Sequence, residues 1–503
     1  MNGSDIEFDD IQGLVRFGHG HLDAASFLLL RVTNPARARK WLASAPVTNA
    51  TKEKPPRRAL QVAFTYDGLR ALKVPAKILA DFSLEFVSGM TEKSRARRLG
   101  DVGANAPARW AWGGRGKKMP HVMVMLYGES RGFPAQEAAL TRELQRSGLA
   151  LLHPLTTLDI GGVEPFGFAD GVSQPELDWD RKKPARFRET RNYTNLAALG
   201  EFLLGYPNEY GRYTDRPLVE ATDDPRGLLP LAEDRPGRHD FGKNGTFLVV
   251  RDLAQDVRGF WRFLDKQSGH DRAKGRKLAA AMTGRNMNGD PIVRMHPWPI
   301  PGVGHDLDDV WGNQFTYAQD PDGLACPFGA HIRRANPRNA DLPPRARGLW
   351  RWALRTLGFG NRSPREDLVA STRFHRLLRR GREYGTALPQ ENALTPAKRN
   401  GSDERGLRFM CLNANILRQF EFVQSAWLEN SIFDGLSEET DPIVGNRRTL
   451  MSGRRTDTFS IPQENGLRRR VTGLPRFVTV QGGAYFFLPG IRALRYIAES
   501  GRK

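Results

Sequence analysis

The sequence predicts an α+β protein with two domains, 1–165 and 166–503. Over roughly the first 160 residues, strand-like and helix-like segments follow in the order strand, helix, strand, then strand, helix, strand, which is the order of a ferredoxin-like domain. A similar alternation returns after residue 245, although no sequence repeat is detectable. We therefore expect two α+β domains, the first of which is ferredoxin-like.

The first domain is read from short apolar runs that alternate with longer amphipathic segments. Short apolar runs favour strands, and apolar residues three or four apart favour helices. The predicted strands are SFLLLRV (26–32), ALQVAFT (59–65), HVMVMLYG (121–128) and LALLH (149–153). The predicted helices are PARARKWLASA (35–45), DGLRALKV (67–74) and PAQEAALTRELQRSG (134–148).

The second domain repeats these signals between polar stretches. Strands are predicted at TFLVVRD (246–252) and LRFMCLNA (407–414), and RFVTVQGGAYFFLPG (476–490) suggests a hairpin or close strand pair around Gly482-Gly483. Each of the first two strands precedes a helix with one apolar stripe. The stripes comprise Val257, Phe260, Trp261 and Leu264, and Ile416, Phe420, Val423 and Trp427. Residues 178–243 and 339–370 look like excursions, the second with a short helix, RGLWRWALRTLG.

Composition excludes several classes of protein. With 503 residues, of which 39% are hydrophobic and 26% charged, the chain fits a soluble globular protein, and no run approaches the roughly 18 apolar residues that span a membrane. The start, MNGSDIEFDDIQG, has no apolar core and resembles neither a signal nor a transit peptide, so a cytoplasmic location is expected. Two cysteines without CxxC or CxxCH argue against structural zinc and covalent c-type haem.

The net charge of +20 and the pI near 10.2 raise nucleic acid as a partner. Basic residues cluster in EKSRARR (92–98) and GLRRR (466–470) but are spread over the whole chain. Zinc-finger, RRM and KH signatures are absent from the sequence. A solvated basic surface is therefore the favoured interpretation, and a basic nucleic-acid-binding protein is the alternative from another class.

Three segments carry groups suited to chemistry. In PFGFADGVSQPELD (165–178), Asp170 lies between Gly167 and Gly171, which mark an irregular loop. The carboxylate either points at a ligand or bonds its own backbone in a turn. In CPFGAHIRRANPR (326–338), His331 follows small residues and precedes three arginines. It is either a structural histidine or the ligand of a flat anionic group, and haem has that shape and charge.

The third segment, FHRLLRRGREYG (374–385), has paired arginines before a glycine. By itself it is a basic segment. If one of these arginines meets Asp170 and His331 at a haem, the histidine holds the iron and leaves the opposite face open. The aspartate then moves a proton between the two oxygens of a peroxide, and the arginine stabilises charge as their bond breaks.

Together these segments resemble the dye-decolourising peroxidases. GFADG is similar to the GxxDG motif of that family, CPFGAHIRRANPR to its proximal-histidine segment and LLRRGREYG to its distal-arginine segment, in the same order. FDDIQGLV, NGTFLVVRDLAQDVRGFWRFL and GGAYFFLPG extend the resemblance to most of the chain except the excursions. It implies two ferredoxin-like domains with antiparallel sheets and peripheral helices, and non-covalent haem b mainly in the C-terminal domain. It also implies hydrogen-peroxide-dependent oxidation of dyes, phenols and other aromatic reductants.

The resemblance also assigns roles to individual residues. Asp170 is the distal acid-base, His331 the proximal ligand and Arg379 the distal arginine, with Arg380 pointing elsewhere. Compact relatives have an asparagine where this chain has Gly381. The other residues implied at the haem are Gly167, Phe168 and Gly171 of the GxxDG segment, Arg334 at a propionate, Leu407 and Phe409 along the distal pocket, and Asp441 as hydrogen-bond acceptor of the imidazole.

Some alternatives stay open. Asp434 competes with Asp441, and either of them is equally compatible with a helix cap. A haem-binding or haem-iron-releasing protein without peroxidase turnover needs His331 but does not need Asp170 and Arg379 together. Trp427 and Tyr384 are candidates to relay electrons from large substrates, although Trp427 lies on an apolar stripe and is favoured as core. The sequence is compatible with a monomer or a homodimer, and it gives no sign of a membrane partner.

Overall fold

The computed structural model describes residues 6–51, 54–114, 116–181, 195–293, 313, 315–317, 320–338, 371–395 and 404–500. The second excursion, 339–370, and its predicted helix lie outside the described residues. No helix in the described ranges is long and apolar enough to cross a membrane.

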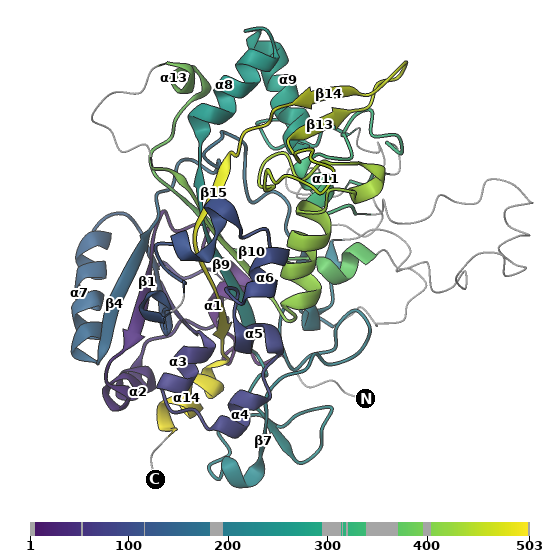
Figure 1. Ribbon diagram of the computed structural model, residues 1–503. Helices are drawn as coiled ribbons and strands as arrows, with labels where there is room; N and C mark the ends of the chain where they lie inside the picture. Colours follow the sequence, from purple (N-terminus) through teal and green to yellow (C-terminus); the bar gives the residue numbers. More distant parts are fainter. Residues whose placement is uncertain are drawn as a thin grey trace, which may run out of the picture.

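One nine-stranded antiparallel sheet forms the centre of the described structure (Figure 1). Its strand order is β10-β12-β9-β15-β2-β3-β1-β4, and β11 also pairs with β12. The strands are β1 (Ala24–Val32), β2 (Ala59–Phe64), β3 (Val122–Gly128), β4 (Leu149–Thr156), β9 (Thr246–Gln255), β10 (Leu378–Arg379), β11 (Arg382–Tyr384), β12 (Gly406–Asn413) and β15 (Val478–Leu488).

The sheet consists of two halves with the same order of strands. In the first half, β1, β2, β3 and β4 are arranged β4-β1-β3-β2, with α2 (Pro35–Ser44) between β1 and β2 and α7 (Phe133–Arg146) between β3 and β4. In the second half, β9, β10, β12 and β15 are arranged β15-β9-β12-β10, which is the same permutation. The prediction of two ferredoxin-like units is thereby confirmed, and they join where Phe487 of β15 pairs with Phe64 of β2. The division at residue 165 stays a prediction.

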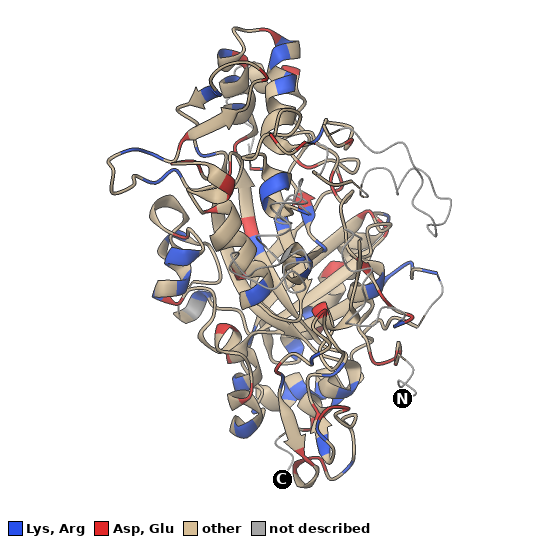
Figure 2. Ribbon diagram, turned by 90° about the vertical axis from the view of Figure 1, so that its right-hand side faces the viewer, with Lys and Arg blue, Asp and Glu red and all other residues tan. Residues whose placement is uncertain are grey.

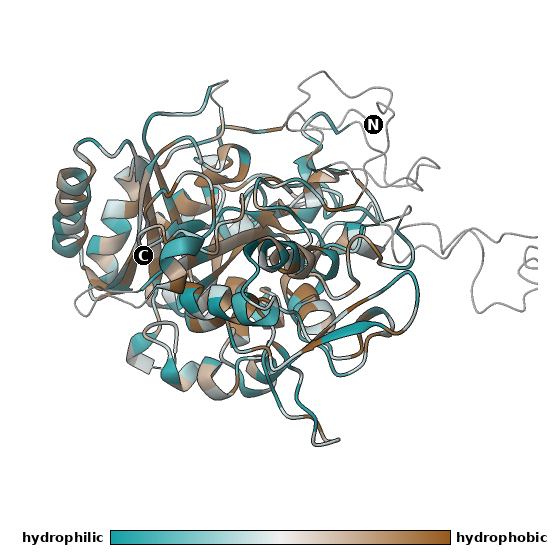
Figure 3. Cartoon of the chain, turned by 90° about the horizontal axis from the view of Figure 1, so that it is seen from above, coloured by the Kyte–Doolittle hydropathy of each residue, from teal (hydrophilic) through white to brown (hydrophobic). Residues whose placement is uncertain are grey.

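Helices cover both faces of the sheet, and the sequence shows why. All seven residues of β3 are buried, and successive side chains point to opposite faces. One face packs on α2, on α14 (Ile491–Glu499) and on the short helices that follow β2. In Figure 3 the central strands are mostly hydrophobic and the outer helices mixed. The short helices that follow β2 are α3 (Tyr66–Ala71), α4 (Ala76–Ala80), α5 (Leu84–Ser88) and α6 (Lys93–Arg98), and further short helices include α1 (Gly13–Phe17) and α13 (Gln390–Leu394).

The predicted hairpin at Gly482-Gly483 is wrong, because β15 runs through this pair as one strand. Gly482 and Gly483 pair with Asp252 and Arg251 of β9, next to a shift of register after Val480. A Cβ atom on Gly482 would lie 2.3 Å from Trp112 Nε1, and one on Gly483 would lie 2.8 Å from Met90 Sδ. The two glycines therefore allow close packing on the sheet rather than a turn.

Both predicted amphipathic helices are present. Val257, Phe260, Trp261 and Leu264 are buried on α8 (Val257–Gln267), which packs against α9 (Arg272–Thr283). The second helix winds as two π-helical segments, Leu417–Glu421 and Val423–Leu428, with i→i+5 bonds such as Glu421 N to Ile416 O (2.9 Å). Such wide turns in helices are frequent at functional sites.

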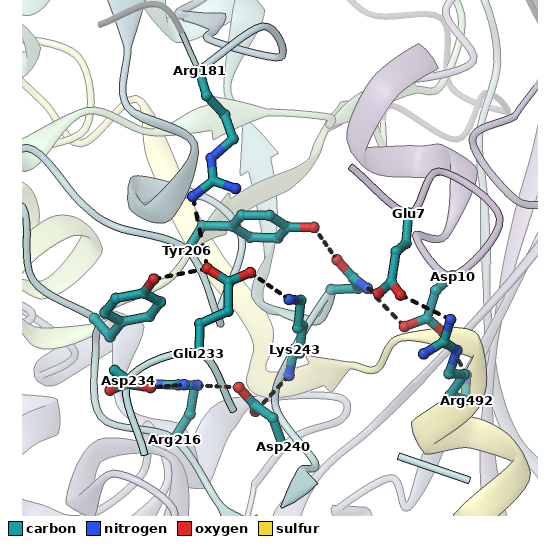
Figure 4. Close-up of polar contacts among 12 residues, drawn as sticks. Glu7, Asp10, Arg181, Tyr206, Arg216, Glu233, Asp234, Asp240, Lys243 and Arg492 are labelled. Atoms are coloured by element: carbon teal, nitrogen blue, oxygen red, sulfur yellow. Dashed lines mark hydrogen bonds and ion pairs between the residues drawn. The ribbon is translucent and has the colours of Figure 1, made fainter. Parts of the chain in front are cut away.

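The described part of the first excursion, residues 178–181 and 195–243, packs against the rest of the molecule. It forms the small strands β6 (Leu196–Ala197), β7 (Leu218–Glu220) and β8 (Arg238–Asp240), and β6 pairs with β5 (Glu176–Leu177). Figure 4 shows its polar side chains joined to both ends of the chain, and Asn244 Nδ2 donates to Asp10 Oδ2 (2.8 Å). Figure 2 shows Lys and Arg distributed over many elements and mixed with Asp and Glu, as the sequence indicates.

Candidate active site

A cavity of about 320 Å³ lies beside the C-terminal half of the sheet. Asp170, His331 and Arg379 all line it, although they come from segments far apart in the sequence. Most of its remaining wall is apolar and includes Leu407 and Phe409, which project from the same face of β12. The structure thus brings the three predicted catalytic groups and the predicted apolar pair to one cavity.

Asp170 sits on a loop that the two glycines make possible. Gly167 and Gly171 have φ angles of 101° and 78°, which side-chained residues rarely adopt. Both interpretations of the aspartate apply, because Asp170 Oδ1 accepts the N–H of Gly171 (2.7 Å) and also faces the cavity. The same oxygen accepts Nη1 of Arg379 at 2.9 Å. Burial raises the pKa of Asp170, but the positive charge of Arg379 and these hydrogen bonds outweigh it and lower the pKa.

The two adjacent arginines point in opposite directions. Arg379 extends into the cavity, and its Nη2 donates to Ser173 O (3.3 Å). Arg380 donates instead to the carbonyl oxygens of Leu14 (3.0 Å) and Val15 (2.8 Å). At Gly381, a Cβ atom would lie 2.8 Å from Arg408 O, so this backbone leaves no room for the asparagine of the compact relatives.

His331 is the first residue of the short helix α11 (His331–Ala335). Its Nδ1 lies 2.9 Å from Oδ2 of Asp441, and Asp441 Oδ1 accepts the N–H groups of Ile443 and Val444 at 2.9 Å each. Burial lowers the pKa of His331, but the charge of Asp441 and the hydrogen bond to it raise the pKa above its usual value. The imidazole of His331 is thus hydrogen-bonded to Asp441. The competing candidate, Asp434, lies in a separate turn, Phe433–Gly435.

The structure does not support the prediction that Arg334 reaches a haem propionate. Arg334 is fully buried outside the cavity wall, and its guanidinium donates to four backbone carbonyl oxygens. Those acceptors are Trp427 O (2.6 Å), Leu428 O (3.4 Å), Asn430 O (3.0 Å) and Glu439 O (2.7 Å). These four hydrogen bonds connect α11 to residues 427–439.

Other arginines line the cavity in its place, namely Arg285, Arg338 and Arg376. Arg285 is only 5% exposed and donates to Gly289 O (2.5 Å) and Ser173 Oγ (3.3 Å), and no carboxylate pairs with it in the described ranges. Burial and the charge of Arg338 lower the pKa of Arg285 to about 10. Sequence reasoning missed Arg285, because nothing in GRNMNGDP around it distinguishes it from a surface arginine.

Some of the other predicted residues line the cavity, and others shape the structure around it. Phe168 and Gly171 line the cavity, whereas Gly167 does not, and its positive φ shapes the loop. Trp427 also lines the cavity and is 9% exposed, while Tyr384 is 7% exposed beneath the guanidinium of Arg408 (3.6 Å). Neither aromatic ring is a surface residue, which agrees with the core interpretation of Trp427.

Comparisons with known proteins agree with this geometry. The chain is 30% identical to a multifunctional dye peroxidase of Amycolatopsis sp. over 463 residues, which cover 87% of this chain and 81% of that protein. It is 28% identical to a dye-decolorizing peroxidase of Auricularia auricula-judae, with 97% and 86% covered. A crystal structure of a peroxidase from that fungus aligns with a TM-score of 0.70 over 98% of this chain and all of the other, at 24% identity. No family model matches the sequence.

Similarity of this extent, along nearly the whole of both chains, defines the class of protein. The chain belongs to the dye-decolourising peroxidase family. It is accordingly an enzyme, a peroxidase.

Proposed function

We propose that the cavity binds haem b without a covalent bond, with His331 as the iron ligand, and that the protein uses hydrogen peroxide to oxidise dyes, phenols and other aromatic reductants. The observation that carries the proposal is the convergence of Asp170, Arg379 and His331 on one apolar-walled cavity. A protein that only binds haem has no need of a carboxylate paired with an arginine there.

The residues around the cavity fit haem in three respects. His331 has its Nδ1 engaged by Asp441, so Nε2 is the ring nitrogen left to bind iron. The walls are largely apolar, as a porphyrin requires. Arg285 brings a buried positive charge without a carboxylate partner in the described structure, and Arg338 lies beside it, which suits the two propionates of haem. Cys326 and Cys411 are buried and do not line the cavity.

Bound haem would supply the iron at which the peroxide is reduced. Asp170 then accepts a proton at its carboxylate from one peroxide oxygen and returns it to the other, which leaves as water. Arg379 keeps Asp170 ionised through the 2.9 Å contact and places a positive charge where negative charge develops. Asp441 fixes the orientation of His331 and raises its basicity as a ligand.

The charge of the protein bears on its substrates. A net charge of +20 attracts anionic aromatic compounds, including sulfonated dyes, whatever their site of oxidation. Large dyes do not fit a 320 Å³ cavity together with haem, so we expect them to react at its mouth or at the protein surface. A cytoplasmic location and a monomeric or homodimeric state remain part of this proposal.

The test begins with the absorbance spectrum and haem content of the purified protein. His331→Ala should lose most of its haem with little change in fold, and Asp170→Asn should retain haem but lose most reactivity with hydrogen peroxide. A His331→Ala protein with full haem content and an unchanged Soret band would refute the ligand assignment. An Asp170→Asn protein that reacts at a near-normal rate would move the acid-base role to another residue.

A further inference from the structure

Glu164 lies at the start of the loop that carries Asp170, and three N–H donors converge on its carboxylate. Its Oε1 accepts the backbone N–H of Phe168 (3.0 Å), and its Oε2 accepts that of Phe166 (3.0 Å). Gln255 Nε2 donates to Oε2 at 2.7 Å. Two of the three donors are therefore backbone groups of the loop between Glu164 and Asp170.

The backbone of this loop closes around the carboxylate. Glu164 N donates to Phe168 O (2.8 Å), and Gly167 N donates to Glu164 O (2.8 Å). Further along, Ala169 N donates to Met287 O (2.9 Å) and Asp170 N to Gly162 O (3.1 Å). Without the carboxylate, the N–H groups of Phe166 and Phe168 would lose their hydrogen-bond acceptor. An unpaired N–H group costs free energy in a buried site.

The third donor connects the loop to the sheet. Gln255 is the last residue of β9, whose neighbours in the sheet are β12 and β15. β12 carries Leu407 and Phe409 along the cavity wall. Through Gln255, the carboxylate of Glu164 links the loop that carries Asp170 to the same sheet that forms the wall of the cavity.

Glu164 lines the same cavity as Asp170 and His331, and its charge acts on both of them. In the part of the chain that the structure describes, no lysine, arginine or histidine forms an ion pair with it. Burial raises the pKa of Glu164 to about 7, even though all three hydrogen bonds favour the carboxylate. A buried carboxylate served only by N–H donors suits a residue that orders a loop.

We propose that Glu164 is a positioning residue for Asp170. Its carboxylate fixes the N–H groups of Phe166 and Phe168 and anchors the loop to β9, and so holds the Asp170 carboxylate over the cavity. The inference rests on the proposed role of Asp170 in proton transfer. It does not require Glu164 to touch the peroxide or the haem.

The test uses Glu164→Gln in the haem-loaded protein. The introduced amide has one acceptor oxygen and one NH2 group, so in either orientation at least one of the two loop N–H groups loses its acceptor. We expect full haem content, amide hydrogen exchange at Phe166 or Phe168 that is at least about tenfold faster, and a rate of reaction with hydrogen peroxide at least about tenfold lower.

Glu383→Gln is the matched control. Glu383 is also a partly buried glutamate whose charge acts on Asp170, but its side chain accepts from Ile160 N (3.4 Å), outside the 164–171 loop. This variant removes a similar negative charge and should leave exchange at Phe166 and Phe168 unchanged. An equal loss of peroxide reactivity in Glu383→Gln would show that charge, and not loop geometry, is responsible.

A double variant separates positioning of Asp170 from other roles. If Glu164 acts through Asp170, adding Glu164→Gln to Asp170→Asn should not slow the peroxide reaction further. If the two losses multiply, Glu164 acts elsewhere and the inference is wrong. If Asp170→Asn alone reacts normally, the proposed function of Asp170 fails instead, which is a distinct outcome.

A second variant covers the case in which Glu164→Gln loses haem or does not fold. Gln255→Leu removes one donor and the link to β9 while leaving both loop amides bonded to the carboxylate. We expect a smaller but measurable increase in exchange at Phe166 and Phe168 and a parallel loss of peroxide reactivity. Unchanged exchange and reactivity within twofold of wild type in this variant would overturn the proposed anchoring.

Discussion

Removing Arg379 is the most direct test of how the cavity controls proton transfer. In Arg379→Leu, Asp170 loses the guanidinium whose Nη1 lies 2.9 Å from its Oδ1, while the burial that raises its pKa stays. An opposite charge at this range lowers a carboxyl pKa by about 1–3 units. We therefore expect the pKa of Asp170 to rise in the variant, because burial is then opposed by fewer favourable contacts, so that the group becomes protonated at a higher pH than in the wild type.

The assay is stopped-flow reaction of the haem-loaded protein with hydrogen peroxide from about pH 3 to 8, followed at the Soret band. The wild type should react well below pH 6, because its base is a carboxylate with a lowered pKa. The acid limb of Arg379→Leu should lie at a higher pH. Its plateau rate should fall more than about tenfold, equivalent to a barrier increase of at least about 1.4 kcal/mol.

Arg380→Leu is the control on the adjacent position. Its guanidinium contacts Leu14 O and Val15 O, away from the cavity, so the variant should keep the wild-type acid limb. If the acid limb of Arg379→Leu coincides with that of the wild type, Asp170 is not the group that titrates. If the shift appears in Arg380→Leu instead, the assignment of the distal arginine is wrong by one residue.

Three further predictions concern the support of the site and of the fold. Asp441→Asn should retain haem but have a more positive haem reduction potential, because a neutral amide raises the basicity of His331 less than a carboxylate does. An unchanged potential in a redox titration would contradict this. Burial raises the pKa of Asp10 to about 6, so the folded state binds more protons than the unfolded state between about pH 4 and 6, and stability falls as pH rises through that window. Relative to Asp10→Asn, the wild type should lose up to about 3 kcal/mol of unfolding free energy between pH 4 and 7, as measured by denaturant unfolding at both pH values. If the unfolding free energies of the two proteins change equally between these pH values, the prediction is wrong. Gly482→Val should destabilise the protein by about 2 kcal/mol or more, since its Cβ would lie 2.3 Å from Trp112 Nε1, and an unchanged denaturation midpoint would exclude the packing role of this glycine.

The order of strands and helices was predictable because local patterns specify it. β1, β2 and β3 are short apolar runs, and the stripe on α8 has helical spacing, so each element is readable without its neighbours. The glycine pair of β15 was misread because the missing side chains give the same sequence signal for a turn and for close packing. Only the position of Trp112 against Gly482, which is a tertiary contact, distinguishes the two.

Tertiary contacts also decide that Arg338 lines the cavity and Arg334 does not. Arg334, three residues after His331, was predicted at a haem propionate, but its guanidinium donates to the carbonyl groups of residues 427–439. Helix α11 ends at Ala335, and Arg338, with a φ of 58°, brings a guanidinium back to the cavity wall. The acceptors that capture Arg334 lie about a hundred residues away, and no local pattern reveals them.

The predicted domain boundary and the candidate site coincide at one loop. A division after residue 165 would separate Glu164 from Phe166 and Phe168, whose N–H groups its carboxylate accepts. The first half also contributes Leu99 and Asn105 to the cavity wall, and β15 joins β2 across the two halves of the sheet. The two ferredoxin-like units are therefore separate in topology but share one cavity, because residues on both sides of the predicted boundary line it and the loop that carries Asp170 is bonded to Glu164.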